Sequence, residues 1–123
     1  MQTDELEIDS RGGIFNIRAV HTHDPAVRVP GKLTMNFFNG SGQWSSLVVE
    51  SVFPDGGLIW DSGRISNGEA STQVVDLVFH VGRAVHVKRW RPGAFGIPGD
   101  GGGEAFFVLP EYGDVVLDIS CLG

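Results

Sequence analysis

Apolar and polar residues alternate along most of this chain in short runs separated by Gly, Asp, Asn and Pro. A period of two residues is typical of β-strands with one buried face, and helical periodicity is nearly absent. We expect strands at 14–21, 32–38, 46–53, 58–61, 72–80, 84–90, 104–109 and 115–121. Eight or more strands spaced about a dozen residues apart predict an antiparallel β-sandwich of the jelly-roll or galectin-like kind, without substantial helix.

Within each strand the same alternation indicates which side chains face the core. In the 72–80 run, Val75, Leu77 and Phe79 share the more apolar face, which we expect to point inward. In the 84–90 run, Val85 and Val87 are expected inside. The residues expected together on the outer side of that strand are His86, Lys88 and Trp90.

Composition limits the classes of function. At 123 residues the chain fits one domain, 1–123, that can bury a core without metal, and its single cysteine, Cys121, excludes an intrachain disulfide. A net charge of −6 argues against nucleic acid as a partner. No segment is apolar over the roughly 18 residues that span a bilayer, so membrane insertion is not expected. The acidic N-terminal segment lacks the features of a signal peptide, which favours a cytoplasmic location, with leaderless export as the alternative.

The motifs of catalysis are weak. The sequence has no Gly-x-Ser-x-Gly nucleophile motif and no phosphate-binding loop, so we predict no catalytic residue and no cofactor. His21 and His23 lie two residues apart in His-Thr-His-Asp (21–24), a spacing that metal ligands use on a strand, with Asp24 as a further candidate. The position where a cupin-type metal barrel needs Glu is Val27. We interpret 21–24 as polar residues that close a strand and predict no metal; a small metal-dependent barrel enzyme is the weaker alternative.

Sugar recognition needs hydrogen-bonding side chains for hydroxyl groups and an aromatic ring for the C–H face of the sugar. Residues of these types that we select as ligand-binding candidates are Asn36, Trp44, Glu50, Trp60, Asp61 and Arg64. Trp90, between Arg89 and Arg91, instead offers the residue types that anchor protein interfaces. The two leading hypotheses are therefore a metal-free module that binds glycans or small saccharides, and a structural or assembly subunit that forms homo-oligomers.

The order of segments resembles that of the galectin-type lectins, small β-sandwiches that bind β-galactosides without a metal. The segments that carry the resemblance are 12–25, 32–53, 58–64, 74–88 and 111–123. Where that family has His-x-Asn-x-Arg, this chain has Val-Val-Glu-Ser-Val, so Glu50 takes the Asn place. Asp61 takes the place of the family's Asn before Ser, and 65–72 lacks the family's stacking Trp. The resemblance implies sugar binding of altered specificity, with Asp61 in the groove and Trp60 in the core.

Overall fold

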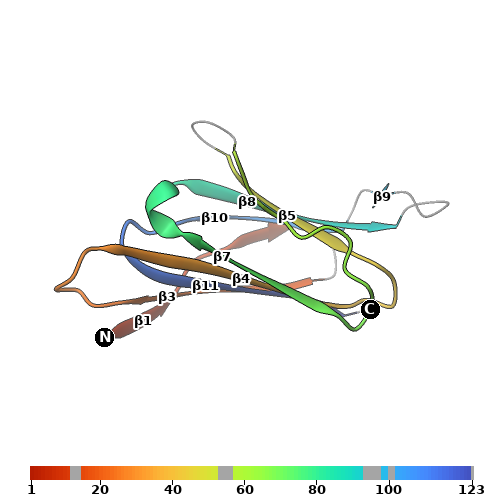
Figure 1. Cartoon of the computed structure of the whole chain (residues 1–123), viewed down its shortest axis with the longest axis horizontal. Helices are drawn as coiled ribbons and strands as arrows, with labels where there is room; N and C mark the ends of the chain where they lie inside the picture. The colour runs from red at the N-terminus through yellow and green to blue at the C-terminus, as the bar shows by residue number, and fades with distance from the viewer. Residues whose placement is uncertain (12–14, 53–56, 93–97, 100–101, 123) are drawn as a thin grey trace.

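The computed structural model describes residues 1–11, 15–52, 57–92, 98–99 and 102–122. Its elements in chain order are β1 (Gln2–Glu5), β2 (Asp9–Arg11), β3 (Phe15–His23), β4 (Pro30–Gly40), β5 (Ser46–Ser51), β6 (Leu58–Asp61), β7 (Ala70–Asp76), the 3-10 turn η1 (Leu77–Phe79), β8 (Ala84–Pro92), β9 (Pro98–Gly99), β10 (Glu104–Val108) and β11 (Gly113–Leu122). The strands form two sheets that lie face to face (Figure 1). The predicted all-β sandwich is confirmed.

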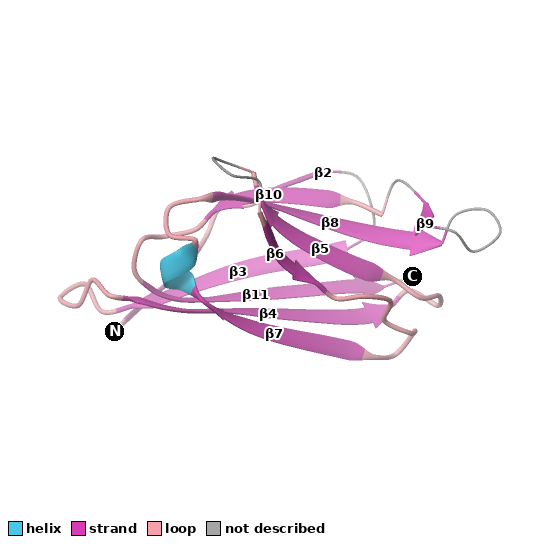
Figure 2. Ribbon diagram, turned by 45° about the horizontal axis from the view of Figure 1, so that its top comes forward, coloured by secondary structure: helices cyan, strands magenta, loops and turns pink. Residues whose placement is uncertain are grey.

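Each sheet combines strands that are distant in sequence. One sheet has the order β1-β3-β11-β4-β7, and the other has the order β2-β10-β8-β5-β6 with β9 paired to the end of β8. Figure 2 shows β3, β11, β4 and β7 side by side in the first sheet. β11 runs antiparallel to β3 and parallel to β4, whereas the other pairings of the described strands are antiparallel. The sandwich is therefore antiparallel apart from one central pair.

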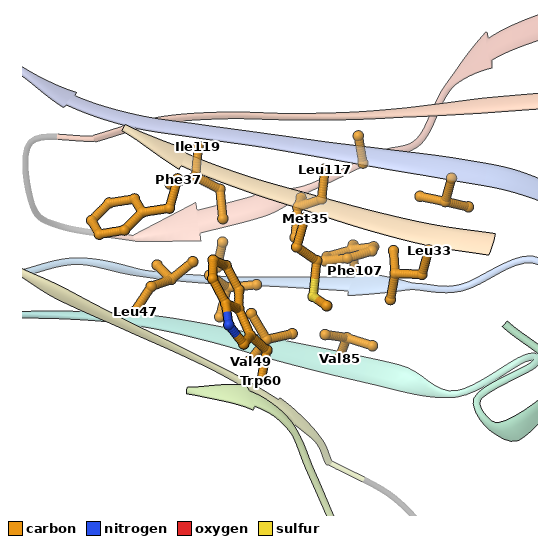
Figure 3. Packing of buried hydrophobic residues seen from close by; sticks show 14 of the residues in the cluster. Leu33, Met35, Phe37, Leu47, Val49, Trp60, Val85, Phe107, Leu117 and Ile119 are labelled. Carbon is orange, nitrogen blue, oxygen red and sulfur yellow. The ribbon is translucent and has the colours of Figure 1, made fainter. Parts of the chain in front are cut away.

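The core lies between the inner faces of the two sheets, and its side chains recur at every second position of the central strands (Figure 3). Trp60 is 8% exposed and sits in this cluster, as predicted from its place in the strand. Val85 and Val87 are fully buried, as expected, and His86, Lys88 and Trp90 are half-buried on the other side of β8. The buried apolar residues of the two inner faces include Leu33, Met35, Phe37, Leu47, Val49, Phe107, Val115, Leu117 and Ile119.

The strand expected at 72–80 ends earlier than its alternation indicates. β7 stops at Asp76, and residues 77–79 form the 3-10 turn. Leu77 is fully buried, whereas Phe79 is 68% exposed, so the prediction that Phe79 faces the core is wrong. A 3-10 turn has three residues per turn, so residues two apart no longer share a face once the strand has ended.

Three strands are absent from the sequence prediction: β1, β2 and β9. β1 and β2 are short, exposed and polar, and they lie at sheet edges, where one paired side suffices and no buried face imposes alternation. β9 lies within 91–103, which the sequence predicts as one long loop. Ile14 and Phe53, the ends of two expected strands, fall outside the described residues. No helix in the described part of the chain has the length and apolarity needed to cross a membrane.

Candidate functional site

A hollow of about 470 Å³ lies on the outer face of the five-stranded sheet, over β3, β11, β4 and β7. The register of these strands sets one polar residue of each into a single row across the sheet. In that row Arg18 faces Asp118, Asp118 faces Asn36, and Asn36 faces Thr72. All four residues line the hollow. The row is thus a product of strand pairing between segments as far apart as 18 and 118.

The side chains of this row hold one another in place. Asn36 Nδ2 donates to Asp118 Oδ1 at 2.8 Å, and Thr72 Oγ1 donates to Asn36 Oδ1 at 2.8 Å. Arg18 forms an ion pair with Glu5 of the neighbouring β1. Within the part of the chain that the structure describes, the second carboxylate oxygen of Asp118 has no hydrogen-bond partner. A ligand that binds to this row contacts side chains whose rotamer freedom is already reduced.

Apolar surface lies on both sides of the polar row. Phe38, two residues after Asn36 on β4, is 41% exposed and lines the same hollow. On the other side of the row, Val116 of β11 and Val74 of β7 also face solvent. The hollow therefore combines hydrogen-bonding groups with an exposed aromatic ring.

The six ligand-binding candidates from the sequence do not converge on one site. Asn36 alone belongs to the row described above. Glu50 lies on the opposite sheet, where its Oε1 is 3.0 Å from Nδ1 of His86, whose Nε2 is 2.9 Å from Oε2 of Glu104. A neutral imidazole donates from one nitrogen only, so both contacts are hydrogen bonds only when the His86 ring is protonated. The Phe106 ring stacks on this histidine with 4.6 Å between the ring centroids.

The remaining candidates serve local structure. Asp61 is exposed at the end of β6, and its Oδ1 accepts a hydrogen bond from the backbone N–H of Gly63 at 2.9 Å, as in the turns that Asp commonly forms. Arg64 lies over the ring of Trp44, with 4.3 Å from its guanidinium carbon to the ring centroid. Trp60 is in the core. The suggestion that Trp60 binds a ligand is therefore wrong, because its ring is covered by both sheets.

The predicted interface Arg89–Trp90–Arg91 is divided by strand alternation. Arg89 is 1% exposed, and its Nε donates to Ser45 Oγ at 2.9 Å inside the sandwich. Burial lowers the pKa of this guanidinium, and the positive charge of Arg91 lowers it further, while Cys121 acts in the opposite direction. Arg89 follows Val85 and Val87 on the inner face of β8, so it is not available as a surface anchor. The prediction that Arg89 belongs to a protein interface is therefore wrong. Trp90 is half-buried on the outer face, with Lys88 over its ring at 4.3 Å.

His21 and His23 close β3, as expected, but they do so as buried side chains, 7% and 8% exposed. Their rings are stacked, with 4.3 Å between centroids and 12° between the ring planes. Asp24, the further candidate, is exposed, and its Oδ1 accepts a hydrogen bond from the backbone N–H of Ala26. The carboxylate that approaches the two rings is instead Asp4, which β1 supplies.

Four other residues near these sites were not selected as site residues from the sequence: Arg18, Thr72, Asp118 and Asp4; Asp118 shares an outer strand face with Asp114, but the sequence offers that pair no evident partner. Each is a single polar residue on an outer strand face or an edge strand, which is the ordinary composition of solvated β-structure. The row can be predicted only when the strand order is known, because Asp118 becomes the neighbour of Asn36 only when β11 pairs with β4.

The sequence matches no protein-family profile and none of the curated proteins compared with it. Among solved structures, the chain is similar to the crystal structure of a DUF3244 family protein with an immunoglobulin-like β-sandwich fold from Bacteroides vulgatus. The alignment covers 86% of this chain and 96% of that chain, at 9% sequence identity and a TM-score of 0.39. The candidate sites therefore rest on the geometry of this chain alone.

Proposed function

We propose that this chain is a carbohydrate-binding β-sandwich module that takes a small saccharide in the hollow on the outer face of the five-stranded sheet. The observation that carries the proposal is the row Arg18–Asp118–Asn36–Thr72, bordered by Phe38, in which hydrogen bonds link Thr72 to Asn36 and Asn36 to Asp118. The proposal keeps the ligand class expected from the sequence and moves the site to the sheet that carries Asn36.

The chemistry of the row fits a neutral polyhydroxylated ligand. Each sugar hydroxyl can donate one hydrogen bond and accept others, so a binding surface needs both donors and acceptors at close spacing. The Arg18 guanidinium only donates, the Asp118 carboxylate only accepts, and the Asn36 amide does both. The ring of Phe38 can cover the apolar C–H face of a sugar, which water solvates poorly.

The hollow also suits a ligand of this size and a modest affinity. It is open, and its side chains are held by hydrogen bonds on rigid strands rather than on loops. An open polar site buries only part of a small ligand, so we expect a dissociation constant in the range of about 1 mM, equivalent to about −4 kcal/mol. Extension of the ligand along the sheet would add contacts with the flanking valines and raise the affinity.

Calorimetric titration with simple mono- and disaccharides tests the proposal, supported by a glycan array for longer chains. The decisive variants are Asn36→Ala and Asp118→Ala, each of which removes polar groups of the row without touching the core. Loss of a hydrogen bond to a charged group is worth about 1.5–3 kcal/mol, so Asp118→Ala should weaken binding at least tenfold. The matched controls are Glu50→Gln and Asp61→Asn on the opposite sheet, which should bind like the unaltered protein.

Two results would overturn the proposal. If no sugar on the array or in the titrations binds at millimolar concentration, the module does not recognise carbohydrate. If Glu50→Gln or Asp61→Asn abolishes binding while Asn36→Ala leaves it intact, the ligand sits on the other sheet and this site is wrong.

Fewer surface residues support the alternative hypothesis, that the chain is an assembly subunit. With Arg89 buried, its surface anchors reduce to Trp90 and Arg91, and Lys88 already covers part of the Trp90 ring. Light scattering over a dilution series measures the mass directly. A Trp90→Ala variant that turns an oligomer into a monomer would favour assembly through this face over an independent sugar-binding module.

A further inference from the structure

We propose that the hollow on the outer face of the five-stranded sheet binds a saccharide with a free amino group more tightly than the neutral sugar of the same shape. This preference rests on the proposed function and refines the ligand class named there. An amino sugar keeps the other hydroxyl groups of the neutral sugar and carries one ammonium group in addition. The charges that strand pairing places on this face of the sheet favour such a ligand.

The outer face of the five-stranded sheet carries more carboxylates than cations. In the part of the chain that the structure describes, strand alternation and register place these charged side chains on it: Glu5, Arg18, Lys32, Asp76, Asp114 and Asp118. Arg18 forms an ion pair with Glu5 of β1. Lys32 forms an ion pair with Asp76 of β7. Each cation of this face is therefore already paired with a carboxylate, and two carboxylates remain.

The two remaining carboxylates, Asp114 and Asp118, differ in their surroundings. Asp114 Oδ1 accepts a hydrogen bond from the backbone N–H of Lys32 at 2.8 Å, and this residue is not part of the lining of the hollow. Asp118 lines the hollow, where its Oδ1 accepts a hydrogen bond from Asn36 Nδ2 at 2.8 Å. An amide donor is uncharged, so it satisfies one oxygen without neutralising the carboxylate. The hollow thus holds a negative charge that no cation among the described residues pairs with.

Arg18 does not cancel this charge, although it belongs to the same row. Its Cα is opposite that of Asp118 in the pairing of β3 with β11, but its Nε donates to Glu5 Oε1 on the other side. One guanidinium between two carboxylates leaves one negative charge in excess. A sugar that brings a carboxylate of its own would add a like charge, so acidic sugars should bind more weakly than neutral ones.

A free amino group complements the arrangement around Asp118. An ammonium group has three donors and no acceptor, whereas a carboxylate only accepts. The second oxygen of Asp118 has no hydrogen-bond partner within the described ranges of the chain, so it is available to such a donor. Asp118 is exposed, and solvent screens the attraction between exposed charges. We therefore expect a gain in affinity of about two- to fivefold over the neutral sugar.

Parallel titrations with matched sugars, followed by NMR chemical shifts at about pH 6 where amino groups are charged, test this preference. The first series is glucosamine, glucose and glucuronate, and the second is galactosamine, galactose and galacturonate. In the series that binds, the dissociation constant of the amino sugar should be about two- to fivefold below that of the neutral sugar, and the acidic sugar should bind most weakly. The difference should shrink in about 1 M salt, where charges are screened beyond about 3 Å.

Two variants locate the preference on one side chain. Asp118→Asn removes the charge while its amide oxygen can still accept the hydrogen bond from Asn36, so the amino sugar should lose its advantage over the neutral sugar. The matched control is Asp114→Asn, which makes the same change in net charge on the same strand and the same face, outside the hollow. This control should keep the advantage of the amino sugar. Both positions are exposed, so neither substitution disturbs the core.

The outcomes separate this preference from the proposed function. If neutral and amino sugars bind equally well, or the acidic sugar binds best, the preference is wrong and the sugar-binding function stands. A preference that Asp118→Asn retains, or that Asp114→Asn removes, also overturns the inference, because the charge that selects the ligand then lies elsewhere. If no sugar of either series binds at millimolar concentration and the glycan array is also negative, the proposed function itself fails, and the preference fails with it.

Discussion

Gly113 allows the two histidines of β3 to pack beside the start of β11, and its replacement by alanine is expected to destabilise the fold. Gly113 has φ +82°, a conformation that residues with a Cβ adopt only at a cost. A Cβ added there would lie 2.7 Å from both His21 Nε2 and the backbone oxygen of Thr22, and 2.8 Å from His23 Cβ. One of these neighbours is backbone, so the strand itself would have to move.

The magnitude follows from two contributions. The left-handed conformation costs an alanine about 1–2 kcal/mol. Overpacking against neighbours that cannot withdraw adds about 1–3 kcal/mol. The sum is a destabilisation of about 2–5 kcal/mol for Gly113→Ala, a large part of the stability of an ordinary small protein.

Gly42 provides the matched control. It has φ +91°, and nothing lies within 4 Å of a Cβ built on it, so Gly42→Ala carries the conformational contribution without the clash. Equilibrium unfolding in urea measures both variants. With a slope of about 1–3 kcal/mol per molar urea, the midpoint of Gly113→Ala should fall roughly 1 M below that of Gly42→Ala. Equal midpoints for the two variants would refute the argument that the histidines need the space left by Gly113.

Two further predictions concern burial. Burial, with the charge of Arg83 nearby, lowers the pKa of His80 below its ordinary value, so the unfolded chain binds that proton more readily. The stability that neutral His80 supports is complete above about pH 6.5 and is lost as the pH falls through its lowered pKa. In the unaltered protein the urea midpoint should therefore decline between about pH 7 and about pH 5, and His80→Gln should make that decline shallower. A dependence of the midpoint on pH that is the same in both proteins would contradict this. Trp60→Ala should lower the free energy of unfolding by about 3–5 kcal/mol in the same assay, because it empties a core position. Leu58→Ala, two residues away and 63% exposed, should change it by about 0.5 kcal/mol or less. Similar losses for both variants would contradict the assignment of Trp60 to the core.

The sandwich could be predicted because its strands each have one buried face. Leu33, Met35 and Phe37 are fully buried at alternate positions, and that period is visible in the sequence. Arg89 shows the strength of the same rule, since alternation from Val85 and Val87 places it inside although its charge suggested the surface. At this position the alternation of the strand indicates burial more reliably than the residue type does.

The candidate sites could not be predicted in the same way. A row that crosses four strands depends on which strands are neighbours, and no local pattern reports that β11 lies between β3 and β4. Asn36 could be selected for its chemistry, but Asp118 and Thr72 acquire a role only through the register. Asp4 lies in a polar edge strand without alternation, so the partner of the two histidines was not visible either.

The central position of β11 also governs when this sandwich can fold during synthesis. β11 is the last of its strands along the chain, yet it pairs with both β3 and β4 in the middle of their sheet. Until a ribosome has released that segment, β3 and β4 each present an unpaired edge, of the kind that recruits strands from other chains. Most of the pairing in this layer therefore waits for β11, and a nascent chain stalled before Gly113 should be a substrate for chaperones rather than a partly folded sandwich.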